Sequence, residues 1–161
     1  MAPFISQFLS WLENSSWAVS IRQSLWLYPA LEIVHIVGIV ILVGAALMFD
    51  LRLLGFSRNL PIVLLARHLL PWSRRGLCLI FPSGILLFIT NAETLGADPT
   101  FQLKMILLIM AALNVLVFHR FIFRSHSYLE VPIDPPLIKV SAIISIIIWV
   151  AIIACGRLLA Y

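Results

Sequence analysis

Four long apolar stretches constrain this chain more than any other feature of its sequence. A helix of about 20 apolar residues crosses the roughly 30 Å hydrocarbon core of a bilayer, and a helix satisfies its own backbone hydrogen bonds there. The sequence therefore predicts an integral membrane protein whose spans are all helical. The expected spans are residues 27–50, 72–92, 101–123 and 137–158.

Composition supports the same class of protein. Of the 161 residues, 62% are apolar and 11% are charged, whereas soluble domains are close to half apolar and a quarter charged. This balance argues against a disordered chain, a secreted disulfide scaffold and a soluble nucleic-acid binder. The expected partner is therefore the lipid bilayer, and no nucleic-acid partner is expected. Cys78 and Cys155 both lie in apolar runs, where cysteine is typical as a small apolar residue.

The connections between the expected spans are short, which favours a single transmembrane domain over residues 1–161, folded as an up-down-up-down four-helix bundle. Ahead of the first span, apolar residues recur at spacings of one, three and four. This pattern predicts an amphipathic interfacial helix at the membrane surface, and the alternative is a loosely ordered tail. The apolar positions are Phe4, Ile5, Phe8, Leu9, Trp11 and Leu12.

Basic residues are distributed unequally between the two ends of the expected spans, and cytoplasmic loops carry the excess of lysine and arginine. The bias predicts that both termini are periplasmic. The cytoplasmic set is Arg52, Arg58, Arg67, Arg74, Arg75, Arg120 and Arg124, with Lys139 just inside the fourth span. The opposite side has Arg22, Lys104 and Arg157.

His35 is the ionisable residue that the sequence places deepest in a span, roughly 10 Å from the outer end of the first one. Such groups are costly in lipid, so each needs a partner, a cavity or a ligand. A neutral imidazole is a common ligand of haem iron, and Glu32 is expected to accept the proton of its other ring nitrogen. Gly38, one turn on, leaves space for a flat ligand or for a closely packed helix. The alternative is a structural histidine, hydrogen-bonded to Glu32 or to a neighbouring helix.

His119, near the inner end of the third span, is the second candidate ligand of a metal or of haem iron. Its expected depth differs from that of His35 by roughly 16 Å, so one iron bridged by the two is not expected. A two-site arrangement is simpler, with His35 near the outer leaflet and His119 near the inner one, where His68 is its partner. Lys104 and Arg157 are candidates to hold a haem propionate or a quinone headgroup, and snorkelling to the interface also explains both.

Seven short segments of the spans carry a family resemblance: residues 31–38, 50–55, 70–72, 104–105, 113–114, 118–120 and 154–158. Together they resemble an uncharacterised family of short bacterial four-span membrane proteins. The resemblance implies the four-helix fold and a bacterial inner-membrane location, and it brings no established activity. More distantly, a histidine early in the first span followed by glycines is similar to small b-type cytochromes and to copper-resistance membrane proteins.

The leading hypothesis is a haem-binding membrane electron-transfer protein, cytochrome b-like, that binds haem b and moves electrons between a quinol and a periplasmic redox partner. His35 and His119 are the first axial ligands to test, and no substrate chemistry of its own is required. A second hypothesis is a non-catalytic accessory subunit of a larger membrane complex. A third is a permease for copper or another metal that uses Glu32, His35 and methionines. The sequence does not fix the oligomeric state, and a homodimer would supply a second histidine from another copy.

Overall fold

The structure, a computed structural model, describes residues 3–118, 120 and 135–159. Four helices in this part of the chain are long and apolar enough to cross a membrane. They are α3 (Leu27–Leu54), α4 (Ile62–Thr90), α6 (Pro99–Val117) and α8 (Pro135–Leu158). The prediction of an all-α membrane bundle is confirmed, and the described residues contain no strand.

The second membrane helix begins earlier than the sequence predicts, at Ile62 rather than at residue 72. At 29 residues α4 is about 44 Å long, which exceeds the roughly 30 Å core of a bilayer. A helix of this length projects beyond the hydrocarbon, so Arg67, which the sequence assigns to a loop, lies on a helical extension and is exposed. Pro71 and Pro82 lie inside α4 without ending it.

The turn between α3 and α4 is closed by Arg52. Gly55 ends α3 in the left-handed region, at φ 106°, and its N–H donates to the Arg52 carbonyl. The Arg52 guanidinium donates to the Leu60 carbonyl oxygen at 2.7 Å and to that of Arg58 at 3.0 Å. The Arg52 guanidinium is therefore hydrogen-bonded to backbone carbonyl groups of the turn.

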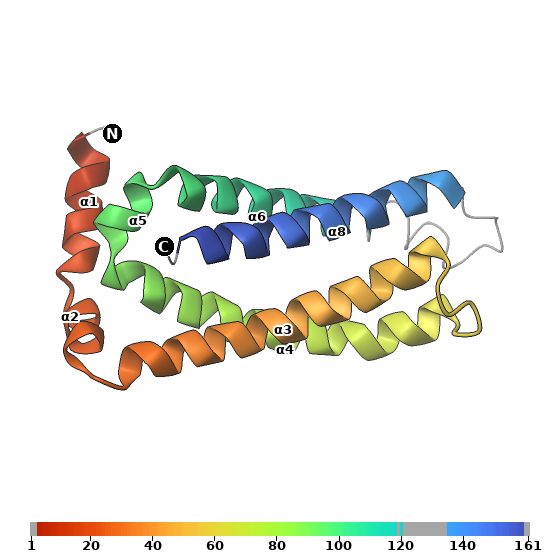
Figure 1. The fold of residues 1–161 in the computed structure, drawn as a ribbon, viewed down its shortest axis with the longest axis horizontal. Helices are drawn as coiled ribbons and strands as arrows, with labels where there is room; N and C mark the ends of the chain where they lie inside the picture. The colour runs from red at the N-terminus through yellow and green to blue at the C-terminus, as the bar shows by residue number, and fades with distance from the viewer. Residues whose placement is uncertain (1–2, 119, 121–134, 160–161) are drawn as a thin grey trace.

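The four spans form two antiparallel pairs. α3 packs along α4, α6 packs along α8, and α3 also packs along α8 (Figure 1). No Cα atom of α4 lies within 8 Å of a Cα atom of α6. The pairs pack together along α3 and α8, a contact here termed the α3–α8 seam, and Phe88 of α4 also stacks on Phe101 of α6 with ring centroids 5.2 Å apart. Leu53, Phe118, Ile138 and Ala142 form a buried apolar cluster near the end of α3 and the beginning of α8.

Each pair has its own close contact. In the α3–α4 pair, a Cβ at Gly76 would lie 2.8 Å from Leu42 N and 2.9 Å from Gly38 O, so only glycine allows the two backbones to approach this closely. In the α6–α8 pair, Ser141 Oγ donates to Asn114 Oδ1 at 2.9 Å, and Asn114 Nδ2 donates to the Ser141 carbonyl at 3.2 Å. Backbone proximity joins the first pair, and a two-bond polar contact joins the second.

The segment before the first span is helical, as the apolar spacing predicts. It forms α1 (Pro3–Glu13) and α2 (Ser16–Gln23), and the Ser15 hydroxyl caps α2 by accepting from the N–H of Ala18. The aromatic face of α1 is exposed, with Trp11 68% exposed, which suits a position among lipid headgroups. Both α1 and the end of α8 lie at one end of the bundle (Figure 1).

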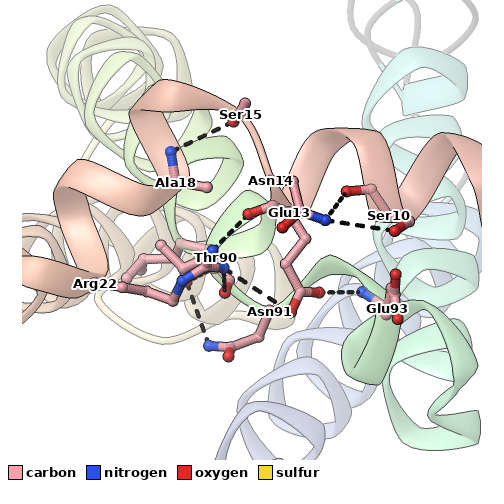
Figure 2. Close-up of polar contacts among 10 residues, drawn as sticks. Ser10, Glu13, Asn14, Ser15, Ala18, Arg22, Thr90, Asn91 and Glu93 are labelled. Atoms are coloured by element: carbon pink, nitrogen blue, oxygen red, sulfur yellow. Dashed lines mark hydrogen bonds and ion pairs between the residues drawn. The ribbon is translucent and has the colours of Figure 1, made fainter.

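Helix α1 docks on the short helix α5 (Ala92–Ala97), which follows α4. Leu9 is buried against Gly96, where a Cβ would lie 2.6 Å from Leu9 Cδ1. The Glu13 carboxylate accepts a hydrogen bond of 2.8 Å from the backbone N–H of Glu93 in the first turn of α5 (Figure 2). The amphipathic helix therefore contacts the body of the protein as well as presenting an aromatic surface.

Candidate functional site

His35 points toward α4 and pairs with Ser83. Its Nδ1 lies 2.9 Å from Ser83 Oγ, and Ser83 is buried at 2% exposure. Gly84, the next residue of α4, lies against the ring, because a Cβ there would be 3.0 Å from His35 Cε1. Any larger residue at position 84 would press on the imidazole.

The hydrogen bonds of Ser83 determine which nitrogen of His35 carries the proton. The single hydroxyl proton of Ser83 is directed at backbone carbonyls of its own helix, those of Leu79 and Ile80. Ser83 Oγ therefore acts as the acceptor toward His35, so Nδ1 is the protonated nitrogen and Nε2 keeps its lone pair. A lone pair on Nε2 is what a hydrogen-bond donor or a metal ion requires.

Lys104 faces this pair from the other half of the bundle. It lies on α6, is partly buried, and is close enough for its charge to act on His35. Its Nζ lies 3.7 Å from the position of a Cβ at Gly156, beside Cys155 of α8. Polar or small residues from all four spans thus meet in the half of the bundle nearest the chain ends.

The structure shows where the two expected neighbours of His35, Glu32 and Gly38, lie. Glu32 is exposed and makes no hydrogen bond to His35 within the described residues; its charge acts on Tyr28, one turn earlier. Gly38 is buried, and the space beside it is filled by α4, since a Cβ there would lie 2.8 Å from Ile80 Cγ1. The sequence left two possibilities for the space beside Gly38, a flat ligand or a closely packed helix, and the structure shows the closely packed helix.

The structure places two of the remaining candidates, His68 and Arg157. His68 is exposed on α4, and at 1.5 Å per residue it lies about 22 Å along the helix from Ser83. His119 lies outside the described residues, so its pairing stays a prediction. Arg157 is exposed in the last turn of α8.

Metal-ligand clusters are limited in the described ranges. No group of three or more His, Cys, Asp or Glu side chains that would hold a metal ion occurs there. Met48, on α3, is 58% exposed, and Met105 and Met110, on α6, are also exposed, so these methionines do not converge on His35. The permease hypothesis therefore gains no ligand set from the described side chains.

Sequence reasoning missed two polar contacts. Ser83 received no role, although a serine directly before a glycine in an apolar span is a typical helix–helix contact. Asp50 also has no role in the sequence analysis, whereas the structure buries it at 6% exposure next to Ser145 of α8. The missed signal is its spacing: Asp50 is three residues before Leu53, a buried core residue of the same helix.

Fold and site together define a multi-pass helical membrane protein with a histidine–serine pair between its first two spans. The chain belongs to a family of unknown function, DUF6644, whose profile matches residues 8–161. No characterised protein and no solved structure matches the chain. The prediction of an uncharacterised family is confirmed, and the more distant likeness to b-type cytochromes stays a prediction.

Proposed function

We propose that this protein binds haem b and carries electrons within the membrane, with His35 Nε2 as a ligand of the iron. The observation that carries the proposal is the hydrogen bond between His35 Nδ1 and Ser83 Oγ. Metal-ligating histidines almost always donate their other ring N–H to a second group, which orients the ring. Haem, when bound, supplies one-electron redox chemistry, and the protein residues bind and orient it.

The described residues offer one histidine at this depth, so the second ligand is part of the proposal. A second copy of the chain is the simplest source, and His119 is the alternative within one chain. Lys104 is our candidate to hold a haem propionate or the headgroup of a quinol, because its charge acts on His35 and no described carboxylate pairs with it. The electron acceptor in this proposal is a periplasmic redox partner.

Location follows from the charge distribution. We propose a bacterial inner membrane, with the arginine-rich turn between α3 and α4 in the cytoplasm and both termini in the periplasm. The supporting observation is that Arg58, in the turn, and Arg67, near the start of α4, are exposed at that end of the bundle. The position of α1 and α2 at the opposite end then puts their exposed tryptophans at the periplasmic surface.

One spectrum tests the function. Detergent-purified protein should show a Soret band that shifts on reduction, and His35→Ala should abolish or alter it. Arg74→Ala is the control, because it removes an exposed side chain of the same partner helix, α4, that has no place in the proposed haem site. Protein that shows no Soret band after expression with added haem precursor, or a spectrum unchanged by His35→Ala, contradicts the proposal.

A second candidate is a non-catalytic accessory subunit of a larger membrane complex. The observation that favours it is the same hydrogen bond, since His35 and Ser83 already link α3 to α4 without any ligand. Co-purification with other membrane proteins in fixed stoichiometry, with no visible chromophore, would support this function. Isolation of the chain as a coloured, self-contained unit would contradict it.

A further inference from the structure

Asp50 is a buried carboxyl group within a membrane-spanning helix. It is 6% exposed on α3, and Ser145 on α8, itself 7% exposed, lies close enough across the α3–α8 seam for its hydroxyl to act on the carboxyl group. Its second oxygen, Oδ2, is buried and has no hydrogen-bond partner in the part of the chain that the structure describes. The carboxyl is thus removed from water and only half satisfied.

No described cation neutralises Asp50. Arg52 lies two positions further along α3, and residues two apart do not share a helix face. Its guanidinium donates to the Leu60 and Arg58 carbonyl oxygens instead. Among the described side chains, the Ser145 hydroxyl is the group that interacts with the Asp50 carboxyl, and no charged side chain does so. The basic residues of the two helices packed on α3 are exposed: Arg67, Arg74 and Arg75 on α4, and Lys139 and Arg157 on α8. Arg120, after α6, is exposed as well.

An ionised carboxylate in this position loses its hydration and gains no counter-ion, which is strongly unfavourable away from water. The neutral acid has no net charge to solvate, and the Ser145 hydroxyl supplies a partner for hydrogen bonding. We propose that Asp50 is a proton-binding site: its carboxyl holds a proton at neutral pH and shares a hydrogen bond with Ser145 across the α3–α8 seam.

The bound proton has a structural consequence. The α3–α8 seam joins the two helix pairs, and loss of the proton would leave an uncompensated negative charge between them. Proton binding therefore stabilises the contact between the pairs. This inference does not depend on haem binding, since Asp50 and His35 lie about 22 Å apart along α3.

Infrared spectroscopy of the purified full chain at neutral pH tests the proposal. A carbonyl stretch of a protonated carboxylic acid is expected in the native protein and is absent from Asp50→Asn. Asp98→Asn is the matched control, because the Asp98 carboxylate caps α6 by accepting from the N–H groups of Thr100 and Phe101 at 2.6 and 3.2 Å. That substitution should leave the protonated-acid band in place.

Ser145→Ala gives a second readout that keeps Asp50 itself. Removing the hydroxyl should move the acid band to higher frequency, because the carbonyl or the acid proton loses its partner. The proposal is overturned if Asp50→Asn removes only carboxylate absorption, or if Ser145→Ala leaves the acid band unmoved. It is also overturned if the carboxylate is ionised and stability rises with sodium or potassium, which would make this a metal-cation site.

Discussion

Arg22 on α2 donates a hydrogen bond of 2.7 Å from Nη1 to the carbonyl oxygen of Thr90, the last residue of α4. Its Nη2 donates at 2.7 Å to the Glu13 backbone carbonyl at the end of α1, and its Nη1 lies 3.9 Å from the Glu13 carboxylate oxygen Oε1 (Figure 2). One guanidinium therefore satisfies carbonyl groups at the C-terminal ends of two helices, where a positive charge is favoured. Arg22 fixes the N-terminal helices to the end of the second span.

Arg22→Ala should destabilise the protein by about 1–3 kcal/mol, because the buried Thr90 carbonyl loses a charged donor. Thermal unfolding in detergent measures the loss, and protease cleavage between α1 and α2 should accelerate. Arg74→Ala, at an exposed position on α4, is the control and should change neither quantity. Equal unfolding temperatures for the two variants would show that Arg22 does not hold the N-terminal helices in place.

Gly76→Ala should cost about 1–3 kcal/mol, since its methyl group would meet backbone atoms of α3 at 2.8 and 2.9 Å. Gly44→Ala is a matched control on α3, because no atom lies within 4 Å of a Cβ there. Alanine favours helix over glycine by up to about 1 kcal/mol, so this control should leave stability unchanged or raise it. Reversible unfolding in mixed micelles compares the two, and a tolerated Gly76→Ala would contradict the close α3–α4 contact.

Ser83→Ala should weaken haem binding by roughly 10–100-fold if His35 is a ligand, because the ring loses the group that orients it. Titration of the apoprotein with haem, followed by absorbance, gives the dissociation constant. Ser73→Ala, elsewhere on α4, is the control. Unchanged affinity for Ser83→Ala would show that the His35–Ser83 hydrogen bond serves only to join the two helices.

The orientation in the membrane is testable by cysteine labelling in a Cys78→Ala, Cys155→Ala background. A membrane-impermeant maleimide should label Ser16→Cys in intact cells, because positive-inside charge puts the N-terminal helices outside. Asn59→Cys, in the turn between α3 and α4, should be labelled only after the membrane is opened. The reverse pattern would invert the proposed topology.

The sequence by itself determined the class of protein, the all-helical fold and the four spans. Length and hydropathy suffice for this, because a backbone within lipid must satisfy its hydrogen bonds internally. The helix ends were less predictable: α4 extends back to Ile62, since the apolar core of a span does not limit a helix that continues into water.

Tertiary structure alone decided which polar groups meet. The sequence indicated that His35 needs a partner, and the nearest carboxylate in the chain, Glu32, was the expected one. The partner is Ser83, which is brought to His35 by the close glycine contact between α3 and α4. Asp50 is two residues from Arg52 in the sequence, but its carboxyl group lies next to Ser145 of α8. Hydropathy locates each span, and so it predicts the depth of a residue in the membrane. The rotation and pairing of the helices depend instead on the shapes of side chains from segments far apart in the chain.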